Sequence, residues 1–429
     1  MKVLMFGWEF PPHISGGLGT ACYGLTKGLS TIEDIELIFV VPKAYGDEEQ
    51  NKLKLIAAGD VSVCGRLKIL KELEKSLQYI EVKSKLVPYT DPEDFWHQQS
   101  VSGEKSGTPL KIDEKGRIKF TGKYGANLFK EISDYALTAN LIARDNEFDI
   151  IHAHDWLTYP AGIAAKQVSG KPLVIHVHAT DFDRSGGNVN PNVFAIEKKG
   201  MEAADKIITV SNLTRNVVIE KYGISPDKVE TVYNAVEPVQ QKRDLKLKKG
   251  VDEKIVTFLG RITMQKGPEY FVEAANKVLQ KMDDVRFVMA GNGDLTNKMI
   301  RRTAELGISN KFHFTGFLKG DEVFEMLNMS DVYIMPSVSE PFGISPLEAM
   351  QSNVPVILSR QSGVAEILTH AKKVDFWDTD AMADAIHGIL KYPALSKMFI
   401  KHGKKEAERL KWEDSACNVC SIYSSTLIA

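Results

Sequence analysis

Ten short, continuous runs of apolar residues recur along the chain, between segments whose apolar positions have helical spacing. Runs of this length without polar alternation are typical of strands that are covered on both faces. Such strands form a parallel sheet with helices on either side, so the pattern predicts an α/β fold throughout. The predicted strands are 3–8, 35–41, 148–154, 173–179 and 206–211, then 254–260, 285–291, 311–317, 332–337 and 354–359.

A break separates the first five runs from the last five. The segment 233–254, "YNAVEPVQQKRDLKLKKGVDEK", holds a proline and many lysines but almost no apolar periodicity, as is typical of a linker. At 429 residues the chain is also too long for one ordinary core. We therefore expect two doubly wound, Rossmann-like domains, 1–236 and 237–410, facing a central cleft.

Two segments depart from this regular order. Residues 46–123 are irregular: 67–89 predict a helix and then a strand, and the polar stretch 97–116 predicts a surface excursion. The last residues, 411–429, predict one amphipathic helix. We expect that helix to pack back on the N-terminal domain.

Composition points to a soluble globular protein, with 43% hydrophobic and 26% charged residues and a formal charge of −2. This balance gives no reason to expect nucleic acid binding, and no apolar stretch approaches the roughly 18 residues of a membrane span. Glu9 interrupts the first apolar run and no small-residue cleavage site follows, so we expect a cytoplasmic protein. Peripheral membrane contact and the oligomeric state stay open.

The chain has four cysteines, two of which form "CNVC" in the predicted last helix. A zinc site needs a second such pair, and Cys22 and Cys64 each stand alone. At spacing i, i+3 we expect Cys417 and Cys420 to be two small buried hydrophobes.

The run "SGGLGTACYGLTKGL", 15–29, begins with three glycines in five residues, at 16, 17 and 19, between the first predicted strand and a helical pattern. Glycine in a folded segment costs roughly 0.5–1 kcal/mol relative to alanine, so a cluster marks either a positive φ or a ligand against bare backbone. Free N–H groups at such a strand-to-helix junction bind anions in α/β proteins. The spacing matches neither G-x-G-x-x-G nor a P-loop, so a tight turn without a ligand is the alternative.

The loop "GRITMQKG" follows the first strand of the second domain and holds Arg261 and Lys266. Two cations at a strand end suit a pyrophosphate, because arginine grips two oxygens and lysine is a mobile point charge. The alternative is a pair of solvated surface cations. Gly-Lys-Ser/Thr is absent, which argues against a P-loop NTPase.

The segment "SVSEPFGISPLEAM" follows the predicted strand 332–337 and carries two glutamates. Pro341 and Gly343 predict a turn, after which Pro346 opens a helix. Glu340 is thus expected on the loop and Glu348 on the helix, where carboxylates can accept hydrogen bonds from sugar or ribose hydroxyls. Taken alone, Glu348 is as well explained as a helix-terminal charge.

Histidines and acids follow two further strands, in "HAHDW" and "HVHATDFDR". Alternation places His176 and His178 on one strand face, a pattern that invites a metal cluster. The i, i+4 helix pairs and closely spaced cysteines of strong zinc motifs are absent from the sequence, so we expect no metal here. "DFD", 181–183, is also an Asp-x-Asp, a three-residue match too short to predict a manganese site.

Together these motifs resemble the retaining glycosyltransferases of the B-type fold, and within them the glycogen and starch synthases and their sucrose-synthase-like relatives. The resemblance spans nearly the whole chain. It rests on Gly16–Gly19, "HAHDW", "VHATDF", "GRITMQKG", "GNGD" and "EPFGISPLEAM". It implies an enzyme that moves a hexose, glucose above all, from a nucleoside diphosphate sugar to an α-glucan.

The resemblance also implies roles for single residues. The backbone N–H groups of Gly16 and Gly17 would meet the diphosphate of the donor, which Arg261 and Lys266 would neutralise. Glu340 would bind the hydroxyls of the donor sugar. Residues with further implied roles are His178 at the transferred sugar, Glu348 at the ribose, Gly291, Leu318, Gly343 and Ile344 along the nucleotide, and Asp155, Asp181 and Arg184 on the acceptor side.

In this family the acceptor approaches on the face that the diphosphate leaves, without a nucleophilic carboxylate and with side-chain cations in place of a metal. The resemblance therefore implies no cofactor, the donor, ADP-glucose or UDP-glucose, being a substrate. One departure is that Ile14 stands where synthases that use ADP-glucose have a lysine. The alternatives are a same-fold transferase with a lipid or cell-envelope acceptor, and a non-catalytic protein that binds nucleotide sugars.

Overall fold

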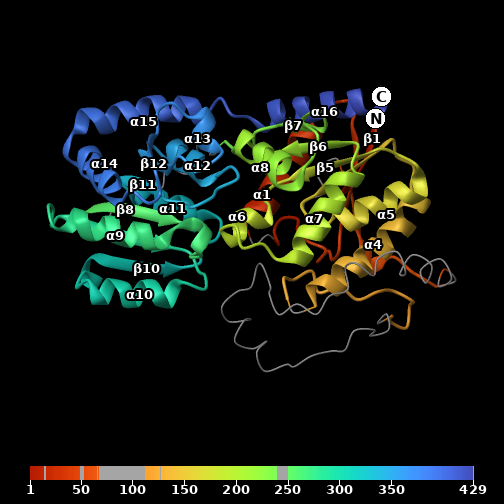
Figure 1. The fold of residues 1–429 in the computed structure, drawn as a ribbon, viewed down its shortest axis with the longest axis horizontal. Helices are drawn as coiled ribbons and strands as arrows, with labels where there is room; N and C mark the ends of the chain where they lie inside the picture. The colour runs from red at the N-terminus through yellow and green to blue at the C-terminus, as the bar shows by residue number, and fades with distance from the viewer. Residues whose placement is uncertain are drawn as a thin grey trace. The chain divides into compact units, whose positions relative to one another are not determined.

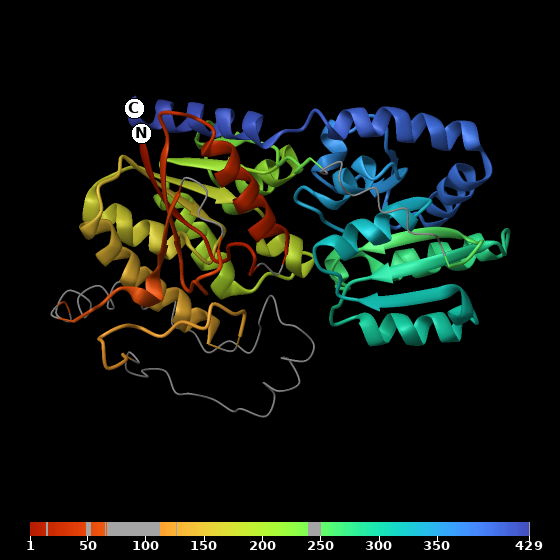
Figure 2. The ribbon, with the colours of Figure 1, turned by 180° about the vertical axis from the view of Figure 1, so that it is seen from behind.

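The computed structural model describes residues 1–13, 16–48, 53–64, 66, 112–125, 127–238 and 250–428. These residues form two compact units. Unit 1 comprises Met1–Asp181, Val189–Ala235 and Trp412–Ala429, and unit 2 comprises Phe182–Asn188 and Val236–Lys411. Figures 1 and 2 show the ribbon from opposite sides. Ile14, the helix and strand predicted in 67–89, and most of the surface excursion predicted in 97–116 lie outside the described residues.

Unit 1 is built on a seven-stranded parallel sheet with the order β3-β2-β1-β4-β5-β6-β7. The chain starts in the middle at β1, builds outward to β3, and then crosses back to β4, which is the doubly wound topology. Its strands are β1 (Lys2–Phe6), β2 (Glu36–Val41), β3 (Leu53–Ala57), β4 (Ile150–His154), β5 (Leu173–Val177), β6 (Lys206–Thr209) and β7 (Val229–Thr231).

The helices of unit 1 form two groups by contact. α4, α5 and α7 pack in a row, whereas α1 packs against α16. The bounds are α1 (Gly17–Leu29), α4 (Leu128–Asp145), α5 (Tyr159–Ser169), α7 (Pro191–Ala203), α8 (Asn212–Tyr222) and α16 (Trp412–Ile428), with 3-10 turns η1 (Ala58–Asp60) and η3 (Pro226–Lys228). The short helix α6 (Asp181–Ser185) begins at Asp181 of unit 1, and its other residues belong to unit 2.

Unit 2 repeats this plan with a six-stranded parallel sheet in the order β10-β9-β8-β11-β12-β13. Its strands are β8 (Lys254–Leu259), β9 (Val285–Ala290), β10 (Phe312–Gly316), β11 (Val332–Met335), β12 (Val356–Ser359) and β13 (Lys372–Val374). Its helices are α9 (Pro268–Leu279), α10 (Thr296–Glu305), α11 (Asp321–Met329), α12 (Ser345–Gln351), α13 (Val364–Ile367), α14 (Thr379–Lys391) and α15 (Pro393–Ala407), with 3-10 turns η4 (Met264–Lys266) and η5 (Ser309–Lys311).

Neighbouring residues of β8 show why the strands are continuous apolar runs. Val256 and Phe258 join a large core with α9 and α14, while Ile255 joins a second cluster with Val288 and Met326. Successive side chains of a strand point to opposite faces, so both faces of this sheet are buried. The prediction of two doubly covered parallel sheets is confirmed.

The C-terminal helix α16 packs against α1 within unit 1, and Figures 1 and 2 show the two side by side. Two glycines of α1 make this contact possible. A Cβ at Gly24 would lie 2.1 Å from the indole of Trp412, and one at Gly28 would lie 2.5 Å from the Trp412 carbonyl oxygen. These glycines are therefore required by helix packing.

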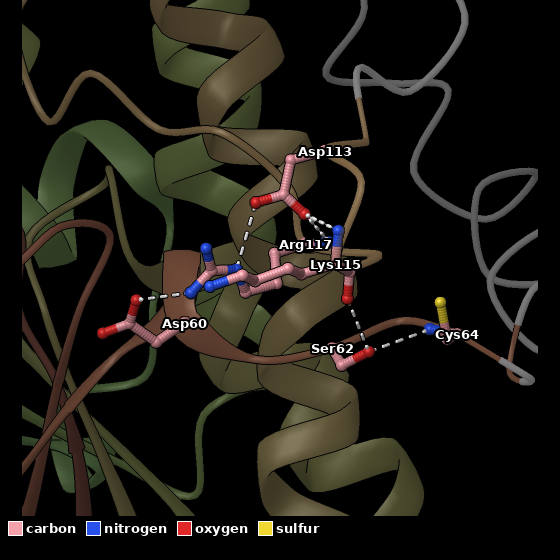
Figure 3. Close-up of polar contacts among 6 residues, drawn as sticks. All are labelled: Asp60, Ser62, Cys64, Asp113, Lys115 and Arg117. Atoms are coloured by element: carbon pink, nitrogen blue, oxygen red, sulfur yellow. Dashed lines mark hydrogen bonds and ion pairs between the residues drawn. The ribbon is translucent and has the colours of Figure 1, made fainter.

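Residues 113–117 form a polar turn in unit 1 (Figure 3). The Asp113 carboxylate accepts hydrogen bonds from the backbone N–H groups of Lys115 and Arg117, at 2.9 and 2.8 Å, and from the Arg117 guanidinium at 3.1 Å. These bonds, led by the one from the Arg117 backbone, lower the pKa of Asp113. An isolated antiparallel β-bridge between Ser62 and Arg117 joins this turn to the segment that follows η1.

Three strands and two cysteines differ from the sequence prediction. The unpredicted strands β3, β7 and β13 all lie at or next to a sheet edge, where burial on one side is incomplete and the apolar run is short or broken. The prediction that Cys417 and Cys420 are buried was wrong, because Cys417 is exposed and Cys420 is half-buried. The buried face of α16 instead presents Trp412, Ala416, Val419 and Tyr423.

Among the described residues, no helix combines the length and the apolar character that crossing a membrane requires.

Candidate functional site

The loop that follows β8 in unit 2 carries the two predicted cations. Arg261 comes two residues after β8, and Lys266 ends the 3-10 turn η4. Gly267 then starts α9 with a φ of 65°, and a Cβ there would lie 2.1 Å from the Pro336 carbonyl oxygen. Glycine is thus required for this loop to approach the end of β11 so closely.

The loop after β11 brings Glu340 to Lys266. The Lys266 ammonium and the Glu340 carboxylate form an ion pair, and the Ser337 hydroxyl donates to the same carboxylate at 3.3 Å. The Glu340 side chain is 9% exposed and that of Lys266 is 21% exposed, so water screens this pair only in part. The sequence predicted both residues as site residues, and the structure brings them into direct contact.

Backbone hydrogen bonds hold the Glu340 loop on both sides. The Glu340 N–H donates to the Gln361 carbonyl, and its own carbonyl accepts from Gly363, both at 2.9 Å. Toward the β8–α9 loop, the Val338 backbone N–H donates to the Gln265 carbonyl at 2.9 Å, and the side-chain amide of Gln265 donates to the Ser339 carbonyl at 3.2 Å. The carboxylate is therefore placed by fixed backbone before any ligand binds.

Glu348 lies in the first turns of α12, as predicted, and Ile344 caps that helix. Gly343 has a φ of 99°, a conformation that L side chains rarely adopt, and so makes the turn between the two glutamates. Burial of the carboxyl raises the pKa of Glu348 to about 7. Near neutral pH this group therefore exists in both forms and can donate as well as accept a hydrogen bond.

Gly291 lies at the end of β9, beside the start of the cation loop. A Cβ at this position would lie 1.9 Å from the Gly260 carbonyl oxygen, and the Gly291 N–H donates to Gly316 at 2.8 Å. Beyond β10, Phe317 is 52% exposed while Leu318 packs on the core cluster around Ile255. The ends of β8, β9, β10 and β11 thus share one edge of the sheet of unit 2.

In unit 1, the glycine run lies where β1 gives way to α1. Gly16 is extended, with a φ of 179°, and Gly17 is the first residue of the helix. A Cβ at either position would meet no heavy atom of the described residues within 4 Å, and both glycines are exposed. Neither packing nor a positive φ requires glycine here, in contrast to Gly24 and Gly28 of the same helix.

Four imidazoles form a layered cluster at the ends of β4 and β5, which we call the histidine stack: His152, His154, His176 and His178. Ring centroids of His152 and His154 are 4.2 Å apart, and those of His176 and His178 are 4.4 Å apart, both pairs stacked. His154 Nδ1 and His178 Nε2 share a hydrogen bond of 3.0 Å. Of the four, only His178 is partly exposed, so it alone reaches the surface.

Burial lowers the pKa of every imidazole in the stack. The pKa of His178 falls to about 3 through burial, and those of the other three lie well below the ordinary value, with neighbouring imidazoles adding to the effect. The stack is therefore neutral at physiological pH.

The predicted acceptor-side residues have structural partners. Asp155 is buried with a φ of 63°, and its N–H donates to the His176 carbonyl at 2.9 Å. The Asp181 carboxylate accepts from the Asn190 backbone N–H at 2.5 Å, and its own N–H donates to Glu197 at 3.0 Å. Arg184 lies in the last turn of α6.

Sequence reasoning missed partners that come from distant segments. Tyr423 of α16 forms a hydrogen bond with His152 Nδ1, and Ser337 and Gln265 support Glu340. Tyr423 is 271 residues from His152, and no local pattern signals such a contact. Ser337 is different, because it lies three residues before Glu340 at the end of a predicted strand.

Comparison with known proteins gives two family matches. Residues 239–406 match the family of glycosyl transferases group 1, and residues 113–240 match Glycosyltransferase Family 4. An uncharacterized glycosyltransferase of Methanocaldococcus jannaschii is 27% identical over 99% of this chain and 98% of its own length. A glycogen synthase of Mycobacterium tuberculosis is 22% identical over 99% of this chain and 94% of its own.

Solved structures agree at the level of the fold. Anabaena Alr3699/HepE, crystallised in complex with UDP and glucose, superposes with a TM-score of 0.68 at 14% identity, covering 99% of this chain and all of that one. Two α/β units, each built on a parallel sheet, together with this likeness define the B-type glycosyltransferase fold, GT-B. The family matches and the fold together support a glycosyltransferase of group 1. The 239–406 part of the chain, which holds Arg261, Lys266 and both glutamates, is the part that matches the group 1 family.

Acidification is predicted to destabilise unit 1 through the histidine stack. Because burial holds the imidazole pKa values below the ordinary one, the unfolded chain binds protons first as pH falls. The contribution of the stack is fully present above about pH 6.5 and is lost as pH falls toward about 3. Urea unfolding followed by far-UV circular dichroism should show midpoints that decrease from about pH 7 to about pH 5, above the range where most carboxylates titrate.

Two substitutions test the assignment. His178→Gln removes one titrating group and should reduce the pH slope of the free energy of unfolding by about one proton. His387→Gln, which replaces a histidine of α14 outside the stack, should leave the slope unchanged. A parent chain whose stability is flat over this range contradicts the neutral stack.

Proposed function

We propose that the chain is a retaining hexosyltransferase that moves glucose from UDP-glucose or ADP-glucose to an α-glucan. The observation that supports this most is the Lys266–Glu340 ion pair. It lies at the carboxyl ends of the strands of unit 2, within residues 239–406, which match the group 1 family. It sets a cation suited to a diphosphate beside a carboxylate suited to sugar hydroxyls.

Donor binding would exchange the partners of this pair. Without a donor, Lys266 and Glu340 neutralise each other. A diphosphate would draw the flexible lysine to its oxygens, because phosphate carries more charge than one carboxylate. Glu340, held by its backbone bonds to the loop at Gln361 and Gly363, would stay in place with its carboxylate open to the sugar.

The transition state of such a transfer gains negative charge on the departing phosphate. Arg261 and Lys266 would stabilise that charge, which is usually the largest catalytic effect of an enzyme. In unit 1, Gly16 and Gly17 are exposed and carry no side chain, which supports their proposed role as backbone N–H donors to an anion. Glu348, with its raised pKa, would form hydrogen bonds with the ribose hydroxyls, and His178 would face the transferred sugar.

The donor and acceptor in this proposal follow the relatives. One is a glycogen synthase, and the solved structure of Anabaena Alr3699/HepE holds UDP and glucose. Transfer without a divalent metal and a cytoplasmic location belong to the same proposal. A lipid or cell-envelope acceptor is its alternative.

Product analysis tests the reaction. Purified chain incubated with UDP-glucose or ADP-glucose and a maltooligosaccharide should release nucleoside diphosphate and extend the acceptor by single glucosyl units. Proton NMR of the new linkage should show the α-anomer. A β-linked product contradicts retention, and diphosphate release only with a lipid-linked acceptor favours the alternative. A chain that binds these donors but releases no diphosphate with any acceptor is a binding protein, not an enzyme.

Lys266→Ala tests the electrostatic role. We expect a loss of about 2–4 kcal/mol of transition-state stabilisation, the scale of one preorganised partner, measured as a decrease in kcat/KM. Brief EDTA treatment should leave the parent rate nearly unchanged, and manganese should not rescue the variant.

Lys298→Ala is the matched control, since Lys298 also pairs with a glutamate, Glu269, but on the surface. It should keep the parent rate. If EDTA abolishes activity and manganese restores it, the proposal that side-chain cations, and not a metal ion, neutralise the diphosphate is wrong.

A further inference from the structure

Three of the stacked histidines bring ring nitrogens close together inside unit 1. His152 and His154 lie on the same face of β4, and His176 of β5 is paired in register with His154. All three side chains are buried, at 2% exposure or less. One nitrogen from each lies within 4.8 Å of the others.

The second observation is which nitrogens already have partners. His152 Nδ1 is bonded to the Tyr423 hydroxyl and His154 Nδ1 to His178, whereas the Nε2 atoms of both have no hydrogen-bond partner among the described residues. Neither ring nitrogen of His176 has one within that part of the chain. A buried polar atom without a partner destabilises the fold, so these nitrogens favour a group that would bind them.

This pattern matches that of metal-bound histidines. A ligating imidazole typically gives one nitrogen to the metal, while a second group holds the other nitrogen and fixes the ring. Tyr423 and His178 supply that outer contact for His152 and His154.

A divalent cation in the protein interior also needs negative charge nearby. Asp155 and Glu9 are both buried, and their charges contribute to the raised pKa of the Cys22 thiol. That thiol in turn lies within 4.8 Å of ligand atoms of His154 and His178. The charges that act on the Cys22 thiol therefore lie in the neighbourhood of the stack.

We propose that His152, His154 and His176 bind a divalent transition metal ion of the zinc class. Neutral imidazoles suit zinc, copper and nickel, and three of them leave a fourth position of a tetrahedral zinc ion for water. Because the rings are stacked, binding requires side-chain torsion changes that bring the three nitrogens to about 3.3 Å apart, as a tetrahedral zinc ion requires, and Tyr423 and His178 would have to move with their rings to keep the outer contacts.

The ion would hold β4 and β5 together and, through Tyr423, tie α16 to the sheet. It takes no part in charge stabilisation on the diphosphate. This inference departs from the sequence-based expectation of no metal, which rested on motif spacing and not on the unpartnered nitrogens.

Zinc binding to the full chain is the test. Chain stripped by prolonged dialysis against EDTA should take up one equivalent of Zn²⁺ in equilibrium dialysis, and its thermal unfolding temperature should rise. Co²⁺ in place of zinc should give the visible absorption bands of a tetrahedral nitrogen site. Uptake of no tight equivalent, or only octahedral cobalt, overturns the proposal.

Variants locate the ion. His176→Asn should abolish the tight equivalent, and Tyr423→Phe, which removes only an outer contact, should weaken it about 10-fold or more. Circular dichroism checks that each variant is folded, and Tyr423→Phe carries the test if His176→Asn is not. His402→Asn is the control, because His402 stacks on His370 at 4.8 Å in unit 2, and it should keep the tight equivalent. Zinc lost from this control and retained by His176→Asn overturns the assignment. None of these readouts depends on transferase activity.

Discussion

Parallel pairing is the constraint on which the rest of this molecule depends. In both described sheets every paired strand runs in the same direction, so the loops that follow the strands gather at one edge. Arg261, Gly291, Leu318 and Glu340 follow four different strands and yet share the edge of unit 2. The histidines of β4 and β5 meet at the corresponding edge of unit 1 for the same reason.

The Lys266–Glu340 pair shows how that edge becomes a site. Taking two charges out of water carries a large desolvation penalty, and breaking such a pair leaves one charge uncompensated. The pair is therefore weak evidence for stability and better explained by binding. Both side chains lie in a partly dry environment, at the position where, in the proposed function, a diphosphate and a sugar would replace the internal partner.

Sequence patterns predicted most of the fold and part of the site. Strands such as β1 and β8 were predictable because burial on both faces leaves a continuous apolar run, whereas β13, with the sequence Lys-Lys-Val, is too polar to give one. Local motifs also placed Glu340 on a loop and Glu348 on a helix.

What the sequence could not give were contacts between distant segments. Tyr423 meets His152 only because α16 packs on unit 1, and Lys266 meets Glu340 only because β8 and β11 are neighbours. Glycines of the same helix also have different structural reasons. Packing against Trp412 requires a glycine at position 28, whereas no contact within the described residues requires one at position 17. Only the folded structure distinguishes these two cases.

The partner exchange of Lys266 and Glu340 is the central claim, and calorimetric titration with UDP, which has the diphosphate but no sugar, tests it most directly. Lys266→Ala should weaken UDP binding by about tenfold or more, because a charge-assisted contact is lost. Glu340→Ala should bind UDP at least as tightly as the parent, because the lysine no longer has a competing partner. In the double variant, the gain from losing Glu340 should disappear. A Glu340→Ala chain that loses UDP affinity as severely as Lys266→Ala would contradict the account.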